Sequence, residues 1–113
     1  MPVKSPMPHV IADFIDAQNR HDAAAVAATF TEKGVVHDEG KDYSGKEEIT
    51  EWVTDTSAKY NPRIEAKNFD TKEKVNVLTA QVSGSFDGSP VMLYYHFEIT
   101  DNLVTSLKIT DQE

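Results

Sequence analysis

The chain contains no cysteine. This absence excludes disulfide bonds, thiol catalysis, iron–sulfur clusters and cysteine-ligated zinc within the chain, and it is typical of a cytosolic protein. The longest apolar runs are only a few residues long, so none is long enough for a transmembrane helix. The first residues also lack the apolar stretch of a secretory signal. We therefore expect a cytoplasmic protein.

Positive charge is also scarce. The 11 Lys and Arg residues are outnumbered by 19 Asp and Glu residues, which gives a net charge of -8. Nucleic-acid-binding proteins normally carry a basic patch, and anionic lipid surfaces attract basic segments, so this balance argues against nucleic acid and membranes as partners. The sequence has neither a P-loop nor the glycine fingerprint of a dinucleotide site. We therefore predict no cofactor.

The chain has 113 residues, enough for one domain with a real core. Its hydrophobic share of 39% and charged share of 27% are close to ordinary globular values, which argues against disorder. Three prolines fall in the first eight residues, so a flexible tail is predicted over residues 1–8. Because no repeat or low-complexity segment divides the rest, residues 9–113 are predicted to form a single domain.

Helical patterns dominate the first half of the chain. Apolar residues recur at one-face spacing over residues 9–20, which predicts a helix there. Asp22 is a good N-cap for a second helix over residues 23–30. Ser44, followed three residues later by Glu47, forms a capping box and predicts the start of a third helix. The next Asn-Pro pair ends this helix because proline cannot continue it.

Strand patterns dominate the second half. A short strand is expected before the third helix, over residues 35–38, followed by a polar loop over residues 39–43. Four further strands are predicted over residues 63–69, 74–86, 91–100 and 103–110. In the last of them, Leu103, Leu107 and Ile109 are expected to share one face. Strands joined by tight turns form an antiparallel meander, and helices segregated from such a sheet define the α+β class.

Several short motifs together carry a family resemblance. They are Ala28-Thr29-Phe30, Val35-Val36-His37-Asp38-Glu39-Gly40, Tyr43-Ser44-Gly45-Lys46-Glu47-Glu48-Ile49, Gly84-Ser85-Phe86-Asp87-Gly88-Ser89-Pro90-Val91 and Tyr94-Tyr95-His96-Phe97. In this order and spacing, over about residues 9–110, they resemble the SnoaL-like members of the nuclear transport factor 2-like superfamily. The resemblance implies a cone-shaped, cystatin-like α+β fold, in which a curved antiparallel sheet wraps around the N-terminal helices and a pocket opens at one end. It also implies a homodimer that pairs through the outer face of the sheet.

The activities of this superfamily are diverse. They include ketosteroid isomerases, polyketide cyclases, dehydratases, epoxide hydrolases and non-catalytic binding modules, so the fold places the pocket without naming the reaction. Ketosteroid isomerase uses a carboxylate base and two hydrogen-bond donors to the oxyanion, a Tyr and a protonated Asp. By resemblance, Asp38 matches the base, Phe14 stands at the Tyr position without a hydroxyl, and Tyr95 stands at the Asp position. This argues against steroid isomerisation itself and implies isomerase-, cyclase- or hydratase-type chemistry on a small apolar carbonyl compound.

Asp38 is the candidate base and Tyr95 the candidate hydrogen-bond donor. Strand alternation places Val36 and Asp38 on one side and His37 on the other, so Asp38 faces the interior if Val36 does. The alternatives are a strand-end carboxylate that binds a loop amide, and a core Tyr95 bonded to the backbone or to Asp38. His37 next to Asp38 would not share its site, because adjacent strand residues point to opposite faces. No metal site is predicted, because metal ligands usually converge from several elements.

A curved sheet packed on helices leaves a wedge in which small-molecule pockets form. The apolar residues expected to line this pocket are Phe14, Phe30, Val36, Trp52, Leu93 and Phe97. The alternative is that these residues only form the hydrophobic core. The two possibilities overlap, because the wall of the pocket in a cone-shaped fold is the upper part of the core. The alternatives to an enzyme are a non-catalytic binding module for an apolar ligand and a structural or interaction homodimer. The partners expected are therefore a small apolar molecule and a second copy of the chain.

Overall fold

The computed structural model describes residues 7–72 and 75–111. Residues 1–6 of the predicted flexible tail lie outside the described residues. Met7 packs against the core, and the Pro8 carbonyl accepts hydrogen bonds from the amides of Ile11 and Ala12 in the first helical turn. In the part of the chain described, no helix combines the length and the apolar character needed to cross a membrane.

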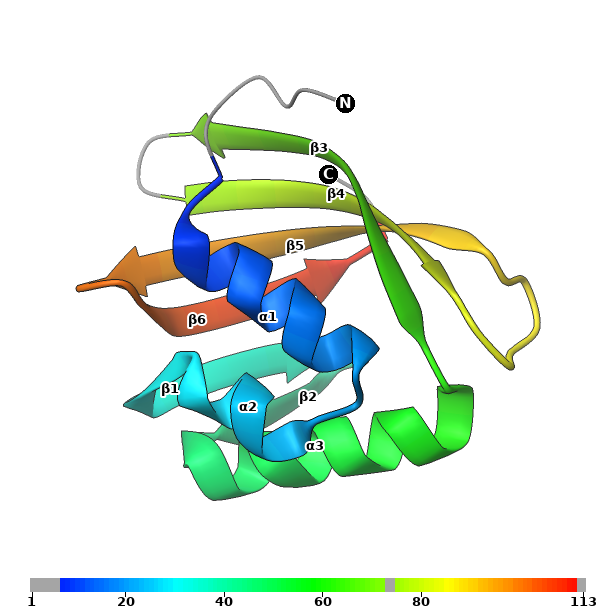
Figure 1. The fold of residues 1–113 in the computed structure, drawn as a ribbon, viewed down its shortest axis with the longest axis horizontal. Helices are drawn as coiled ribbons and strands as arrows, with labels where there is room; N and C mark the ends of the chain where they lie inside the picture. The colour runs from blue at the N-terminus through cyan, green and yellow to red at the C-terminus, as the bar shows by residue number, and fades with distance from the viewer. Residues whose placement is uncertain (1–6, 73–74, 112–113) are drawn as a thin grey trace.

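The fold contains three helices and six strands among the described residues (Figure 1). The helices are α1 (His9–Asn19), α2 (Ala23–Ala28) and α3 (Gly45–Tyr60). The strands are β1 (Phe30–Asp38), β2 (Lys41–Ser44), β3 (Arg63–Lys72), β4 (Val75–Ser83), β5 (Val91–Thr100) and β6 (Leu103–Thr110). The predicted α+β class is confirmed. The boundary between α2 and β1 differs from the prediction, because the helix ends at Ala28 and the strand begins at Phe30.

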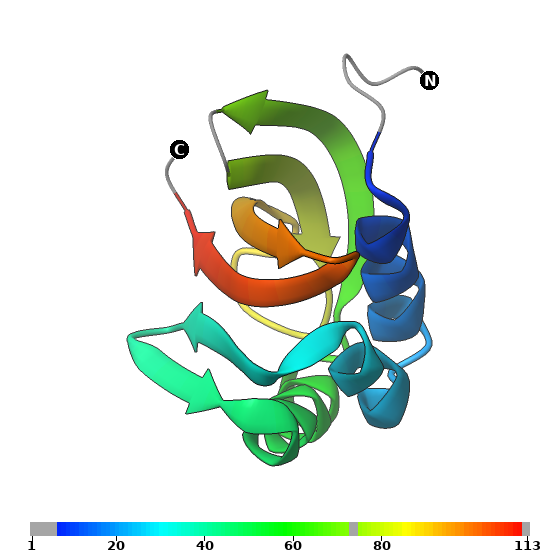
Figure 2. The ribbon, with the colours of Figure 1, turned by 90° about the vertical axis from the view of Figure 1, so that its left-hand side faces the viewer.

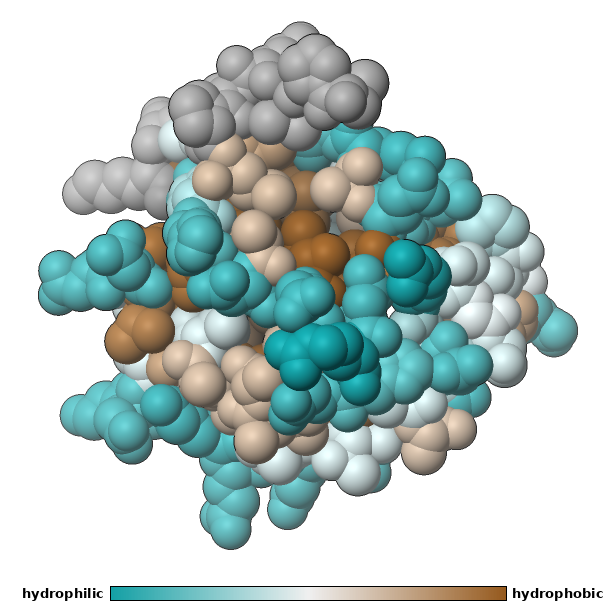
Figure 3. Space-filling view, in the orientation of Figure 1, coloured by the Kyte–Doolittle hydropathy of each residue, from teal (hydrophilic) through white to brown (hydrophobic). Residues whose placement is uncertain are grey.

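The six strands form one open, curved sheet in the order β2-β1-β6-β5-β4-β3. Strands β3 to β6 make the predicted antiparallel meander, whereas β1 joins the sheet parallel to β6. The strands are strongly bent, and α1 and α2 lie together on one side of the sheet (Figure 2). Figure 3 shows the α1 side of the molecule, where apolar residues gather near the centre and hydrophilic residues surround them.

Strand β2 replaces the polar loop predicted over residues 39–43. It pairs antiparallel with β1, and Asp38 stands opposite Lys41. Glu39 and Gly40 form the two-residue connection with φ values of 54° and 77°, which is the type I′ geometry that matches the twist of paired strands. The loop prediction was wrong because β2 has only four residues and is mostly exposed. No alternation of apolar and polar residues therefore marks it in the sequence.

A β-bulge changes the faces expected for the last strand. Glu98 pairs with Ser106, but Ile99 pairs with Val104, so β6 carries one extra residue between these pairs. The shift places both Val104 and Leu107 in the core, although they are three residues apart. Leu103 is 36% exposed, so the expected common face of Leu103 and Leu107 was wrong. Regular alternation cannot reveal a bulge, which depends on the partner strand.

The ends of α3 differ in part from the predicted capping box. Ser44 occupies the N-cap, but its side chain makes no capping hydrogen bond. Instead, its backbone N–H donates to Glu48 Oε1 at 2.8 Å, so the partner carboxylate is that of Glu48 rather than Glu47. The helix ends at Tyr60, where Asn61 adopts a left-handed conformation before Pro62. The predicted C-terminal end is therefore confirmed.

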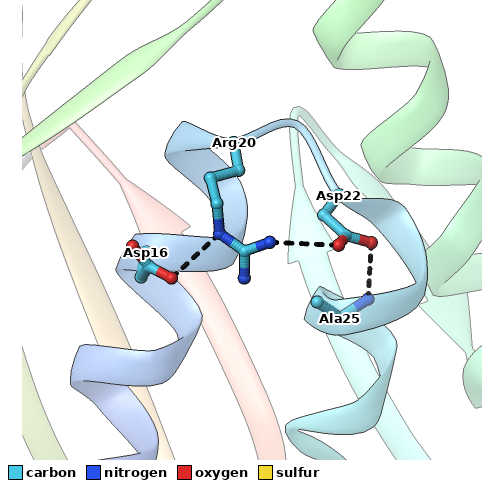
Figure 4. Close-up of polar contacts among 4 residues, drawn as sticks. All are labelled: Asp16, Arg20, Asp22 and Ala25. Carbon is cyan, nitrogen blue, oxygen red and sulfur yellow. Dashed lines mark hydrogen bonds and ion pairs between the residues drawn. The ribbon is translucent and has the colours of Figure 1, made fainter.

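The corner between α1 and α2 holds the first helix in place. The Asp22 side chain accepts a hydrogen bond from the Ala25 amide at 3.0 Å, which confirms the predicted N-cap. Arg20 lies between Asp16 and Asp22 at distances of 2.9 and 3.2 Å (Figure 4). These ion pairs are exposed, and exposed pairs of this kind contribute little to stability. The stronger anchor is Asn19, whose amide exchanges two hydrogen bonds with the Ile64 backbone in β3.

Candidate functional site

A cavity of about 680 Å³ opens between α3 and the sheet. Its volume falls in the range of small-molecule sites, ~300–1,000 Å³. Helix α3 contributes Trp52, Thr56 and Tyr60, which are spaced one helical turn apart and therefore share one face. The remaining wall comes from the ends of β1 and β6, the start of β3, the end of β4, and the β5 residues Val91, Leu93 and Tyr95. Three other side chains also line the cavity: Gln18 of α1, and Phe86 and Asp87 of the β4–β5 connection.

Asp38 reaches this cavity because of its place at the end of β1. Val36 is completely buried in the core, and Asp38, two residues later, lies on the same side of the strand. The β1–β2 turn follows at once, so the Asp38 side chain lines the cavity rather than the closed core. His37 points to the other side, where its Nδ1 atom lies 2.5 Å from Asp42 Oδ1 across the hairpin.

The Asp38 carboxylate is held by a neighbour from α3. Trp52 Nε1 donates a hydrogen bond to Asp38 Oδ2 at 3.0 Å, and the Trp52 side chain is itself buried. Burial raises the pKa of Asp38 above its usual value, and the nearby charge of Glu39 adds to this. The hydrogen bonds from Trp52 and from the Glu39 backbone oppose the rise. Asp38 thus lines the cavity with an indole donor bound to its carboxylate.

Tyr95 lies on the wall of the same cavity. It is 3% exposed, and its hydroxyl has no hydrogen-bond partner among the residues that the structure describes. It therefore donates neither to the backbone nor to Asp38, the two structural partners considered for it. Burial, and secondly the charge of Asp38, raise the pKa of Tyr95, so the phenol stays protonated at neutral pH. A protonated, unbonded hydroxyl is a donor available to a ligand.

The predicted pocket residues divide into two groups. Trp52 and Leu93 line the cavity together with Asp38 and Tyr95. Phe14, Phe30, Val36 and Phe97 are completely buried and do not line it. Three of these are the rings at the centre of the core: Phe14 packs edge-on against Phe30 and Phe97, with ring centroids 6.3 and 5.3 Å apart. The structure also holds no group of three or more His, Asp or Glu side chains placed for a metal ion within the described ranges.

Two features of the cavity were missed at the level of sequence. Tyr60 donates a hydrogen bond from its hydroxyl to Glu39 Oε2 at 3.0 Å, which joins the end of α3 to the β1–β2 turn. Gln18 is 5% exposed and lines the cavity, and its Oε1 atom has no hydrogen-bond partner within the described part of the chain. A polar residue on the apolar face of the first helix is the sequence signal that marks Gln18. No local signal marks the Tyr60–Glu39 contact, because the two residues are distant in sequence.

The hydrogen bond from Trp52 should tune the proton affinity of Asp38. We expect Trp52→Phe to raise the pKa of Asp38 further, because the hydrogen bond from Trp52, which the variant lacks, stabilises the charged carboxylate. A carbon-detected NMR titration of the Asp38 carboxyl group would measure the change. Tyr43→Phe is the matched control, since the Tyr43 ring lies 6.2 Å from the Trp52 ring but its hydroxyl makes no bond to Asp38. An unchanged or lower pKa in Trp52→Phe would contradict the assignment.

The family model of the SnoaL-like domain matches residues 11–107 of this chain. The chain belongs to the SnoaL-like family. A comparison with curated proteins finds no match. The resemblance to SnoaL-like proteins that the sequence motifs carry is therefore confirmed, together with the mixed α+β fold and its curved, open sheet.

Several solved structures also resemble this chain over most of its length. A candidate polyketide cyclase from Sinorhizobium meliloti is 31% identical, covers 92% of this chain and 95% of its own, and superposes with a TM-score of 0.88. A protein with a ketosteroid isomerase-like fold from Catenulispora acidiphila, solved in complex with trimethylamine, is 19% identical with coverages of 93% and 86% and a TM-score of 0.83. A cystatin-fold protein from Novosphingobium aromaticivorans is 15% identical with coverages of 89% and 94% and a TM-score of 0.75. The last two show the fold alone.

Proposed function

We propose that this SnoaL-like protein binds a small apolar carbonyl compound and moves a proton at the carbon next to the carbonyl group. Asp38 is the base, and Tyr95 donates a hydrogen bond to the carbonyl oxygen. The observation that supports this most directly is the pairing of a fixed carboxylate and an unbonded phenol on the wall of one cavity. The similarity to a candidate polyketide cyclase also supports chemistry of this class.

The proposed step conserves atoms and charge. The Asp38 carboxylate takes a proton from the carbon next to the carbonyl, and the electrons of that C–H bond form an enolate. The Tyr95 hydroxyl donates to the enolate oxygen, where the negative charge develops. The hydrogen bond from Trp52 orients the carboxylate, so that Asp38 meets the substrate in a defined position. The protonated Asp38 then returns its proton in one of three ways, each of which restores the carboxylate. It protonates the enolate at another carbon of the conjugated system, it protonates the alkoxide that forms when the enolate carbon attacks a second carbonyl of the same molecule, or it protonates a hydroxyl that leaves the neighbouring carbon as water.

Burial moves the proton affinity of the Asp38 carboxylate in the direction that this role requires. A general base works best when its pKa lies near the working pH, and burial shifts Asp38 in that direction. The oxyanion receives only part of the stabilisation known from ketosteroid isomerase, because Phe14 supplies no hydroxyl and lies in the closed core. We therefore expect a reaction on an activated substrate, such as a compound whose enolate is conjugated.

A ligand screen followed by an exchange assay tests this function. A panel of cyclic ketones, steroids, lactones and polyketide-like aromatic compounds is added to the protein, and the melting temperature is measured. A ligand present at one hundred times its dissociation constant stabilises the fold by about 2.7 kcal/mol, which corresponds to a shift on the order of ten degrees for a domain of this size. Each compound that binds is then incubated in D2O, and NMR follows deuterium incorporation next to its carbonyl group.

The outcomes separate the two candidate functions. Binding with protein-dependent exchange supports the enzyme. Binding without exchange supports the second candidate, a non-catalytic module that holds an apolar ligand, which the apolar wall alone would favour. A panel without any binding would overturn both. The homodimer through the outer face of the sheet, where Tyr94 and His96 lie, stays a prediction that light scattering would test.

A further inference from the structure

The cavity between α3 and the sheet is lined by charged side chains of one sign. Asp38, Glu39, Asp87 and Asp111 line it, and none of the described lining residues is a Lys, Arg or His. Glu39, Asp87 and Asp111 are also exposed to solvent, so they lie at the opening of the cavity, whereas Asp38 is partly buried. These three belong to the β1–β2 turn, the β4–β5 connection and the position after β6. Three separate segments therefore bring carboxylates to one opening.

No ion pair balances these carboxylates within the described part of the chain. Asp38 accepts a hydrogen bond from the Trp52 indole and Glu39 accepts one from the Tyr60 hydroxyl, and both donors are uncharged. The ion pairs of the described residues all use other carboxylates. An anionic ligand would therefore meet several like charges at the opening, whereas a cationic ligand would be attracted to it.

Aromatic rings stand beside the carboxylates. Trp52, Tyr60 and Phe86 line the cavity, and the face of such a ring attracts a positive charge. Lys59 shows this attraction at the end of α3, because its Nζ atom lies 5.1 Å from the centroid of the Tyr60 ring, although Lys59 does not itself line the cavity. Tyr60 raises the pKa of Lys59, and the charge of Glu39 adds to the rise. This corner of the molecule therefore stabilises a cation.

Tyr95 indicates independently that the cavity receives a ligand. The residue is 3% exposed, and its hydroxyl has no hydrogen-bond partner among the described residues. The buried side-chain oxygens that lack both a partner and accessible surface in the described ranges are those of Gln18 and Ser57, so the Tyr95 hydroxyl keeps accessible surface. Because Tyr95 lines the cavity, this surface opens into it. An acceptor on a ligand inside the cavity can therefore reach the hydroxyl.

The placement of the carboxylates favours an organic cation over a metal ion. Within the residues that the structure describes, no three His, Asp or Glu side chains lie close enough together to hold a metal ion. An organic ammonium group needs no such convergence. It can rest on aromatic rings, while exposed carboxylates attract its charge from several sides.

We infer that the ligand carries a protonated amino group in addition to its ring and its carbonyl group, and that the amino group binds at the opening of the cavity among Glu39, Asp87 and Asp111. The inference rests on the proposed function, because the carbonyl end is assigned to Asp38 and Tyr95 in the interior. The ammonium N–H donates to a carboxylate at the opening, and its alkyl groups pack on the neighbouring aromatic rings. The carboxylates at the opening then determine specificity and take no part in the proton transfer.

Three matched compounds test this inference. They are 4-[4-(dimethylaminomethyl)phenyl]cyclohexanone, 4-(4-isobutylphenyl)cyclohexanone and 4-(4-oxocyclohexyl)benzoate, which share a ketone and a phenyl ring. The amine and the isobutyl compound have nearly the same shape, but only the amine is protonated at neutral pH. For the unmodified protein at low salt, calorimetry should show the amine binding at least tenfold more tightly than the isobutyl compound, although a plain apolar pocket would prefer the latter. The carboxylate compound should bind at least tenfold more weakly than the isobutyl compound.

A double variant connects the preference to the opening. Asp87→Asn combined with Asp111→Asn should lower the preference for the amine at least fivefold, with the affinity for the isobutyl compound within twofold of the original. Asp13→Asn combined with Asp101→Asn is the matched control, because both residues are exposed, neither lines the cavity and the net charge changes by the same amount. This control should lower the preference less than twofold.

Salt provides a test on the unmodified protein. The distance over which exposed charges act falls from ~30 Å at 0.01 M salt to ~3 Å at 1 M. The preference for the amine should therefore fall at least threefold between these salt concentrations, whereas the affinity for the isobutyl compound should not fall.

The possible failures have different signatures. Equal or tighter binding of the isobutyl compound would overturn the inference and leave the proposed function standing. A preference for the amine that survives both in the double variant and at high salt would also overturn it, because the carboxylates at the opening would not be its cause. Deuterium exchange into the bound isobutyl compound tests the proposed function separately. If none of the three ketones binds, the assignment of the carbonyl end falls, and the inference that rests on it falls too.

Discussion

Asp38→Asn is expected to lower the rate of proton transfer by a factor on the order of 10² to 10⁴, the usual contribution of a general base. The amide cannot take the proton, but it has the shape of the carboxylate and an oxygen that can still accept the hydrogen bond from Trp52. Ligand affinity should therefore change little. Deuterium exchange into a bound ketone would measure the rate, and calorimetry would measure the affinity.

Asp42→Asn is the matched control for this experiment. Asp42 lies on β2, close to Asp38 in the sequence, but its carboxylate is exposed and pairs with His37 on the other side of β1. The Asp42→Asn variant should catalyse deuterium exchange into the bound ketone at the original rate. Unchanged exchange in Asp38→Asn would remove Asp38 from the mechanism and return the carboxylate to a structural role at the end of its strand.

The raised pKa of Asp38 adds a pH dependence with a defined sign. The exchange rate should rise with pH through this pKa and then level off, because only the ionised carboxylate acts as a base. Stability behaves in the opposite way. The folded state binds the Asp38 proton more tightly than the unfolded state, whose pKa is near 3.8, so this residue lowers the free energy of unfolding as pH rises through the window above 3.8. Asp38→Asn should therefore melt at a higher temperature than the original protein at neutral pH, and this advantage should vanish below the window.

The sequence predicts the direction of a site side chain where this direction depends only on neighbouring residues in the same strand or helix. Alternation along β1 places Asp38 on the same side as the buried Val36, and a strand needs only its own residues for this rule. Tyr95 follows in the same way from the alternating pattern of β5, in which Tyr95 and Phe97 are buried and Tyr94 and His96 are less so. The helices followed from equally local signals, such as the N-cap at Asp22.

The rest of the site depends on contacts between distant segments. The donor to Asp38 is Trp52, which the sequence shows only as an apolar residue on the inner face of a helix. Gln18 reaches the cavity because Asn19 fixes the end of α1 to β3, a contact between residues far apart in the chain. The bulge near Val104 likewise depends on the partner strand β5. Periodicity carries no information on such contacts.

Whether a buried aromatic residue belongs to the core or to a pocket wall is the distinction that the sequence least reveals. Phe14 and Phe97 have the same character as Trp52, and all three were expected to line the pocket. Only the three-dimensional packing separates them, because Phe14 and Phe97 are surrounded on every side and Trp52 meets the cavity. The separation has energetic consequences that can be measured.

Phe14→Ala is expected to lower the free energy of unfolding by about 3–5 kcal/mol, the usual cost of removing a fully enclosed phenyl ring. Phe14 is completely buried, and its ring contacts those of Phe30, Tyr95 and Phe97. Truncation would leave a void inside the closed core, and the cost of this void adds to the lost burial of the ring. Urea denaturation, followed by circular dichroism, would measure the loss.

Phe86→Ala is the control that distinguishes core from pocket wall. Phe86 is half-buried, lines the cavity and meets Tyr60 with ring centroids 5.8 Å apart, so its removal enlarges a space that is already open. Its expected cost is about 1 kcal/mol, as for most single substitutions. Equal losses in the two variants would contradict the placement of Phe14 in the closed core. A larger loss for Phe14 would show that its ring supports the cavity wall from behind, within the closed core, whereas Phe86 forms part of the wall itself.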